Sequence, residues 1–153
     1  MPGTVHLLVG AAIATLVPNV PVMVVLAFFS HYILDLIPHL DPDTFADDQH
    51  PYTWWQKATL TVDVILVFSL LLALFWLRQE PFQYLLGAVV GLMPDILTPL
   101  ESYPAFTPLK KAHELLHWNK RRARWWSWYV PALLLPVVIS TGALLIIWGE
   151  LNT

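Results

Sequence analysis

The sequence predicts an all-α fold: a polytopic helical membrane protein with a single domain over residues 1–153. The chain is 57% hydrophobic and only 12% charged, whereas charged residues make up about 25% of ordinary soluble domains. Its apolar residues form long runs, and two of these approach the roughly 20 residues that a membrane-spanning helix needs. It contains no Cys, which excludes disulfides and thiolate metal ligands. The net charge of −3 gives no general attraction to nucleic acid, so no nucleic-acid partner is expected.

Proline and polar residues divide the chain into about five membrane-embedded helical segments. The first, 5–17, lacks a basic leader and a cleavage motif, so we interpret it as a retained segment and not as a signal peptide. The sequence "VPNVP" at 17–21 turns the chain, because each Pro fixes φ and removes a hydrogen-bond donor. The second segment, 22–37, stops before Pro38, and a polar, acidic loop at 38–57 follows it.

The other three segments follow this loop. Residues 58–77 have about the length of a spanning helix, and the tight connection "RQEP" joins them to 82–97. A second polar stretch, 101–124, includes a basic interfacial helix, "KKAHELLHWNKRRARWW". The last segment, 128–148, is again long enough to span, with two internal prolines as tolerated kinks.

Positive charge sets the expected orientation. Lys and Arg cluster in the stretch 101–124, whereas Arg78 is alone in the "RQEP" turn. Cytoplasmic loops carry the excess of Lys and Arg, so 101–124 is expected on the cytoplasmic side of an inner (plasma) membrane. Alternation through the segments then places the loop 38–57 and the N-terminus on the same side.

Several His and Asp residues lie in or beside the apolar segments, and this topology places all of them at the cytoplasmic end. They are His6, His31, Asp35, His39, Asp63, Asp95, His113 and His117. The topology does not use these residues, and residues scattered at random would also occupy the opposite ends. We therefore expect their side chains to converge on one polar site.

The residue types and spacings favour a divalent metal. His31 and Asp35 stand one helical turn apart and share a face, which His39 also joins if the helix continues that far. His113 and His117 repeat this spacing in "HELLH", by which one helix gives two imidazoles to one ion. Imidazole and carboxylate without thiolate suit Zn²⁺, or Mn²⁺ and Fe²⁺ in a more oxygen-rich site. The set exceeds the three or four ligands of one zinc, so it has room for a second ion or for residues that orient the ligands.

Asp63 and Glu114 are the candidate catalytic residues. A carboxylate such as Asp63 within an apolar segment costs about 2.5–3.5 kcal/mol on insertion scales, so we expect it to face the bundle interior with a cation as its partner. Glu114 lies in "HELLH", close to the zincin motif H-E-x-x-H, in which Glu is a general base. Structural explanations stay open: a solvated interfacial helix for "HELLH", and a hydrogen-bonded helix end for His31 with Asp35.

Four short sequences carry a resemblance to a known family. They are "TVHLLVGAAIA" with His6, "SHYILDLIPHLD" with His31, Asp35 and His39, "GLMPDILTP" with Asp95, and "HELLH". Here the chain resembles the YdjM-like family of small bacterial membrane-bound metal-dependent hydrolases, and more loosely the zinc-dependent phospholipase C-like proteins. The family's usual "PDIDH" is replaced by "PDILT" in this chain, so one expected carboxylate and one His are missing. The resemblance implies a helical membrane protein with a metal-dependent hydrolytic site.

A metal-dependent hydrolase is the function we expect, acting on a phosphoester of a lipid or lipid-like small molecule at the cytoplasmic interface. The site would lie at headgroup depth beside basic residues, and a metal-activated water would attack the ester. Two alternatives stay open. A metal or proton transporter needs polar residues that continue toward the outer side, where the long segments show only Ser69, Ser140 and Thr141. A structural protein would use the polar residues to lock the bundle and would bind no metal.

Overall fold

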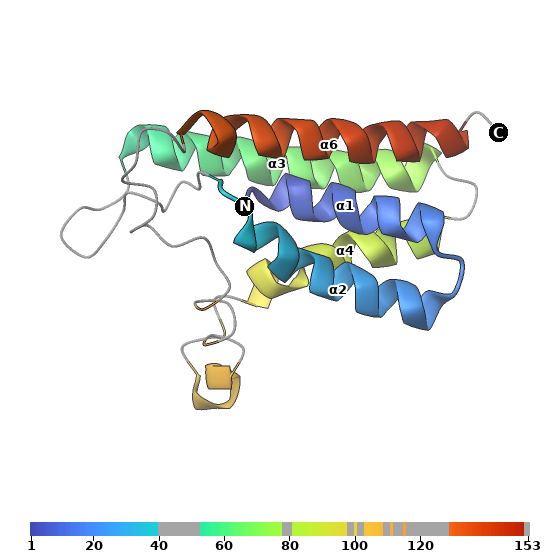
Figure 1. Ribbon diagram of the computed structural model, residues 1–153, viewed down its shortest axis with the longest axis horizontal. Coiled ribbons are helices and arrows are strands. Elements are labelled where there is room, and N and C mark those ends of the chain that lie inside the picture. Colours follow the sequence, from blue (N-terminus) through green and yellow to red (C-terminus); the bar gives the residue numbers. More distant parts are fainter. Residues whose placement is uncertain are drawn as a thin grey trace.

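The computed structural model describes residues 1–39, 53–77, 81–97, 100, 103–108, 111, 115 and 129–151. The regular elements among these residues are helices: α1 (Gly3–Leu16), α2 (Val20–Leu36), α3 (Trp54–Leu77), α4 (Pro81–Leu97), the 3₁₀ helix η3 (Pro104–Phe106) and α6 (Tyr129–Leu151) (Figure 1). The all-α prediction is confirmed, and each of the five predicted apolar segments forms a helix. The basic interfacial helix predicted within 101–124 lies largely outside the described residues.

Local sequence signals set the ends of α2 and α3. The Asn19 side chain accepts a hydrogen bond of 3.1 Å from the backbone N–H three residues later, as an N-cap residue does. α2 ends at Leu36 and Ile37 is extended, because the proline that follows disfavours a helical conformation in the residue before it. At the start of α3, the Thr53 N–H donates to Oε1 of Gln56 at 2.7 Å, which is one half of a capping box.

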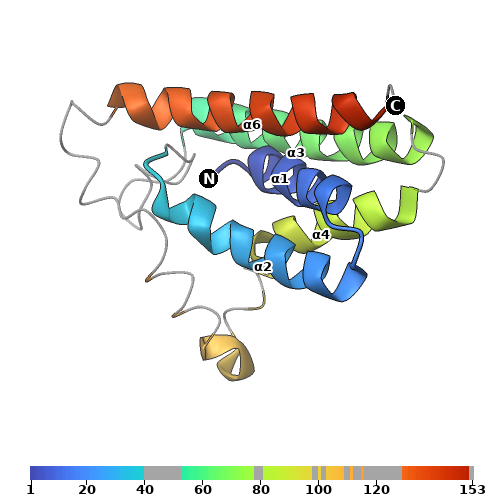
Figure 2. The ribbon, with the colours of Figure 1, turned by 45° about the vertical axis from the view of Figure 1, so that its right-hand side comes forward.

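α1 is the central helix of the bundle. It packs against α2, α3, α4 and α6, and both Figure 1 and Figure 2 show it between the two long helices and the pair α2 and α4. The core around it contains Leu7, Ala11, Leu74, Ala88 and Ile147. A helix that is apolar on all sides is usually buried. The small and aliphatic side chains of α1 are covered by the four helices around it.

Glycines let α1 and α4 approach closely. α4 carries "GAVVG" from Gly87 to Gly91, a small-xxx-small pattern that brings helix backbones together in membranes. A Cβ added at Gly91 would lie 2.7 Å from the carbonyl oxygen of His6, and one at Gly87 would lie 2.6 Å from that of Gly10. Both distances are too short for carbon and oxygen in contact. The helix crossing therefore holds the backbone of His6 against α4.

Side chains from two other helices hold the ends of α1. The N-cap residue of α1 makes no side-chain hydrogen bond; instead, Asp63 of α3 accepts from the first two backbone N–H groups of α1, at 2.8 and 3.1 Å. At the other end, Nε2 of Gln83 on α4 donates to two carbonyl oxygens, each at 3.0 Å. The unpaired N–H and C=O groups at the ends of a buried helix need such partners.

Two of the described helices, α3 and α6, are long and apolar enough to cross a membrane, fewer than the five predicted. α1, α2 and α4 have 14, 17 and 17 residues, or about 21–26 Å at 1.5 Å per residue, which is less than the hydrocarbon core of about 30 Å. α3 and α6 expose large apolar side chains, such as Phe68 at 69% and Leu145 at 67%. Such a surface marks contact with a partner or a membrane, and it favours membrane association.

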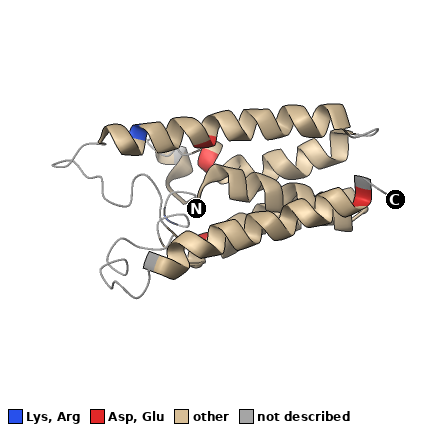
Figure 3. Ribbon diagram, turned by 90° about the horizontal axis from the view of Figure 1, so that it is seen from above, with Lys and Arg blue, Asp and Glu red and all other residues tan. Residues whose placement is uncertain are grey.

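Successive helices run in opposite directions along the bundle. Figure 1 shows the N-terminus of α1 near the C-terminal ends of α2 and α4, while α6 ends at the opposite side. Figure 3 shows several acidic residues near the N-terminus, and Figure 1 shows that α3 extends beyond the start of α1 at this end. The three shorter helices thus bring their predicted site residues to one end of the bundle.

Candidate metal centre

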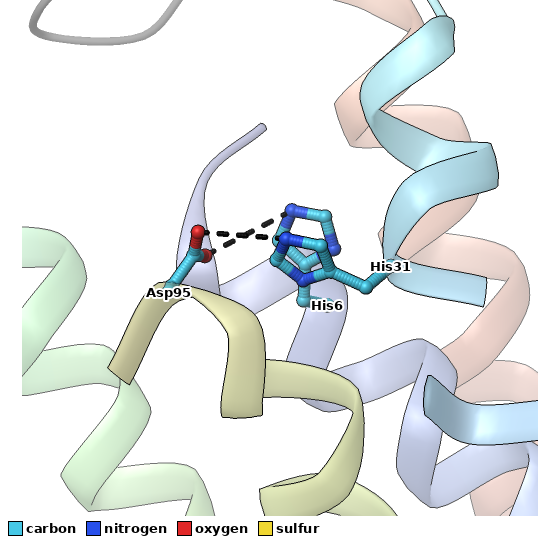
Figure 4. A group of neighbouring side chains, drawn as sticks. All are labelled: His6, His31 and Asp95. Atoms are coloured by element: carbon cyan, nitrogen blue, oxygen red, sulfur yellow. Dashed lines mark ion pairs between the residues drawn. The ribbon is translucent and has the colours of Figure 1, made fainter. Parts of the chain in front are cut away.

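Four ionisable side chains from three helices meet near the N-terminus of α1. α1 supplies His6, α2 supplies His31 and Asp35, and α4 supplies Asp95. We call these four residues the His/Asp cluster, and Figure 4 shows three of them. The two imidazole rings are stacked, with centroids 3.9 Å apart and planes inclined by 24°.

Both imidazole Nε2 atoms face the two carboxylates. Nε2 of His6 is 3.2 Å from Asp35 Oδ1 and 4.0 Å from Asp95 Oδ2. Nε2 of His31 is 3.1 Å from Asp35 Oδ2 and 3.6 Å from Asp95 Oδ1. One ligand atom each from His6, His31 and Asp95 lies within 4.8 Å of the other two, close enough to share a metal ion. Two imidazoles with carboxylate oxygen match the ligands of zinc, manganese or iron.

Three of the four side chains of the His/Asp cluster are buried. The side chains of His6, His31 and Asp35 have no exposed surface, while that of Asp95 is 33% exposed. Placing ionisable groups in apolar surroundings is costly unless they pair with opposite charges or bind a metal. The cluster therefore needs internal compensation, and it opens to its surroundings at Asp95.

A carbonyl group of α4 orients the ring of His31. Nδ1 of His31 lies 3.0 Å from the carbonyl oxygen of Gly91. A carbonyl oxygen only accepts hydrogen bonds, so Nδ1 carries the proton in this contact. Nε2 of His31 then faces two carboxylates, and a proton or a metal ion between them would bridge these atoms. Metal-binding His residues commonly donate their other N–H to a backbone carbonyl in this way.

The ring of His6 also fits a bound cation. It is fully buried, and neither ring nitrogen makes a hydrogen bond among the described residues, although Nε2 lies close to Asp35. Buried side-chain nitrogens normally have a partner, and an ion at Nε2 would supply one. The amino group of Met1 lies 2.8 Å from Asp35 Oδ1, so a cationic group already lies at one edge of the cluster.

Asp63 is not brought into the His/Asp cluster. Its two carboxylate oxygens accept from the first N–H groups of α1, and Oδ1 also accepts from the Thr4 hydroxyl. Carboxylates are stabilised at helix N-termini by these N–H groups and by the helix dipole. The structure thus gives Asp63 a helix N-terminus as its partner, where the sequence predicted a cation.

The other predicted ligands are not part of the described cluster. His39 is buried, and its Nδ1 lies 2.7 Å from the carbonyl oxygen of Ile37. α2 stops before His39, so His39 does not continue the helical face that carries His31 and Asp35. His113, His117 and Glu114 lie outside the described residues, and their roles stay predictions.

Two contributions of α4 were missed by the sequence analysis. The first is the close crossing at "GAVVG", for which glycines four residues apart in an apolar helix are a visible signal. The second is the contact between the Gly91 carbonyl and His31. A backbone acceptor has no signature in the sequence, so this contact could not be anticipated.

Comparisons of the chain with protein-family models, with curated proteins and with solved structures give no match. The resemblance to the YdjM-like family therefore stays a prediction. The geometry of the His/Asp cluster is the main support for a function.

Proposed function

We propose that this protein is a membrane-embedded, metal-dependent hydrolase, related to the YdjM-like family, that acts on a phosphoester of a lipid or lipid-like substrate at the cytoplasmic side of the plasma membrane. The observation that supports it best is the convergence of two imidazole Nε2 atoms and two carboxylates inside an apolar bundle. The four side chains come from three helices, so they meet only in the folded protein. Ionisable residues within membrane segments are expensive and usually functional.

His6, His31 and Asp95 are the proposed ligands of a divalent ion, which we expect to be zinc. Asp35 contacts both imidazoles, so it can complete this ligand set or hold a second ion. When bound, the ion supplies a Lewis acid that polarises the ester and activates water. The water oxygen bonds to phosphorus, the P–O bond to the lipid alcohol breaks, and a carboxylate passes the proton from the water to the leaving alcohol. Asp95, with a side chain that is 33% exposed, is the carboxylate of the described cluster that a substrate can reach.

The proposal places all five apolar helices in the membrane. α3 and α6 cross it, and α1, α2 and α4 lie between or beside them. The ends of α1 support this placement, because side chains satisfy them internally, as a helix end needs where water is absent. The alternating helix directions put the loops 38–57 and 101–124 on one side, and positive charge makes that side cytoplasmic.

Metal content tests the proposal directly. We expect protein purified in detergent to contain about one equivalent or more of zinc, manganese or iron by elemental analysis. His31→Ala removes a ligand and should lower the metal content by about 10-fold or more. His39→Ala is the matched control, because His39 is an equally buried histidine outside the cluster, and it should keep the metal. Equally negligible metal in all three proteins would contradict the proposal.

A structural role for the cluster is the second candidate, and one contact favours it. The amino group of Met1 pairs with Asp35 at 2.8 Å, and a protonated His31 would balance the second carboxylate without any metal. The cluster would then only lock α1, α2 and α4 together. Thermal unfolding separates the two candidates: a chelator should lower the melting temperature of a metalloprotein, because a bound ion stabilises the folded state, and should leave a metal-free cluster unchanged.

A further inference from the structure

In the proposed membrane placement, the contacts of α3 with α1 show how deep the His/Asp cluster lies below the membrane boundary. The apolar part of α3, residues 58–77, has about the 30 Å length of the hydrocarbon core. Lys57 precedes it, close to the exposed Trp54 and Trp55, and these residue types mark the membrane interface. The hydrocarbon boundary at this end therefore falls near residue 58.

The start of α1 lies inside this boundary. Asp63, which binds the first N–H of α1 at 2.8 Å, is about 7 Å past residue 58 along α3. α1 runs in the same direction as α3, and α3 extends well beyond the start of α1 (Figure 1). His6 lies three residues after Gly3, which adds about 4.5 Å. The backbone of α1 at the cluster is thus about 12 Å below the hydrocarbon boundary.

The opening of the cluster borders apolar surface. Asp95 is its exposed member, and the next residue, Ile96, is 53% exposed. On α2, Ile33 lies at the same depth as His31 and Asp35 but on the opposite face of the helix, and it is 62% exposed. Large exposed isoleucines at the depth of a buried polar cluster are typical of a surface that contacts lipid.

We infer that the cluster takes its substrate from within the bilayer: a membrane lipid whose ester bond reaches Asp95 below the level of the headgroups. This inference rests on the proposed membrane-embedded hydrolase and refines it, since the sequence predicts a site at headgroup depth. A water-soluble phosphoester would have to leave water entirely, which is costly for a charged group. A lipid reaches this depth without leaving the membrane, and the divalent ion of the proposed site would compensate the charge of its phosphate.

Single-cysteine spin labels test the depth, and the chain suits them because it contains no Cys. The positions are exposed side chains: Ile33→Cys at the depth of the cluster, Ile65→Cys near Asp63, Phe68→Cys at the middle of α3 and Trp54→Cys at its start. In vesicles, oxygen should relax the labels at 33, 65 and 68 more than a water-soluble nickel chelate does. At position 54 the nickel chelate should relax the label more than oxygen does.

The outcomes separate the depth from the membrane placement. Nickel access at 33 and 65, with 68 protected in lipid, would overturn the inferred depth and leave the membrane-embedded hydrolase standing. Nickel access at all four positions would overturn the membrane placement itself.

Bound Mn²⁺ tests the access of lipid to the cluster. The ion is added to the protein in vesicles that contain lipids with a nitroxide either on the headgroup or near the top of the acyl chain. We expect Mn²⁺ to broaden the acyl-chain signal more than the headgroup signal, and His31→Ala to remove this difference. Stronger broadening at the headgroup would overturn the inference. Equal broadening with wild type and His31→Ala would show that Mn²⁺ binds elsewhere, and it would count against the proposed metal function as well.

Discussion

The carboxylate of Asp63 does for α1 what an N-cap side chain does for an ordinary helix, although it belongs to α3. It accepts from the Gly3 N–H at 2.8 Å and from the Thr4 N–H at 3.1 Å. These donors and the helix dipole stabilise the charged carboxylate, so no cation is needed beside it. His6 follows within one turn, and the same contact therefore positions one of the proposed metal ligands.

Asp63→Asn tests this positioning role. The variant keeps the shape of the side chain but loses its negative charge. One carboxylate oxygen is replaced by an NH₂ group, which is a donor and faces the N–H donors of α1. We expect the free energy of unfolding in detergent to fall by about 1–2 kcal/mol and the metal affinity to weaken by about 10-fold. Glu150→Gln, an acid near the end of α6, is the control for the loss of a negative charge far from the cluster, and it should leave the metal affinity unchanged. A variant as stable as wild type but devoid of metal would instead make Asp63 a ligand.

Residue type and topology together predict the four members of the His/Asp cluster. His6, His31, Asp35 and Asp95 fall at one end of their helices, and alternation of the segments is enough to bring those ends together. The partner of Asp63 could not be predicted in the same way. A carboxylate in an apolar segment indicates only that some partner exists, and the identity of that partner depends on which helix end lies beside it.

The contact between α1 and α4 sets the geometry of the cluster at the scale of helices. Gly91 contributes to it twice. Because Gly91 has no side chain, the backbone of His6 can lie against α4, and its carbonyl oxygen accepts from Nδ1 of His31. One residue of α4 therefore positions both imidazoles.

Gly91→Ala should disturb both contacts. The new Cβ would lie 2.7 Å from the carbonyl oxygen of His6, so the two helices must move apart. We expect a loss of about 1–3 kcal/mol in the free energy of unfolding, together with a fall in metal content. Gly142→Ala on α6 is the matched control, because nothing lies within 4 Å of a Cβ there; it should be neutral or stabilise by about 0.5–1 kcal/mol. Equal effects of the two substitutions would contradict the close crossing.

The helices themselves are well predicted, whereas their arrangement is not. Prolines and polar residues interrupt the apolar runs, so the five segments and their approximate ends follow from the sequence. The central place of α1 does not follow, because each segment is apolar on most sides and has no polar face to show which side meets its neighbours. Its small residues Gly10, Ala11, Ala12 and Ala14 are the one local hint that other helices approach α1 closely.

On the scale of the whole molecule, two long helices and three shorter ones share one bundle. The length of a helix, and not its composition, separates them: α3 and α6 have 24 and 23 residues, against 14 for α1. The sequence indicates the same difference, because only 58–77 and 128–148 approach the length of a spanning helix, although it predicts about five membrane-embedded segments. The alternating directions nevertheless place the two ends of the bundle on opposite sides of the proposed membrane.

Thiol labelling in intact cells tests this orientation. Trp54→Cys and Gly149→Cys introduce single thiols at the start of α3 and near the end of α6, at exposed positions. A membrane-impermeant reagent should label Gly149→Cys from outside and should reach Trp54→Cys only after the cells are permeabilised, because the proposed topology places the Trp54 end on the side of the basic stretch 101–124, in the cytoplasm. Labelling of both sites in intact cells, or the reverse order, would contradict the proposed topology.

The two side chains that hold the ends of α1 also bear on how the protein is made. α1 leaves the ribosome before Asp63 and Gln83, which satisfy its terminal N–H and C=O groups. Until then a free α1 in lipid would carry unpaired backbone groups at both ends, at a cost of several kcal/mol for each group. If the bundle lies in the membrane as proposed, α1 can take its central position at low cost only after α3 and α4 have been synthesised.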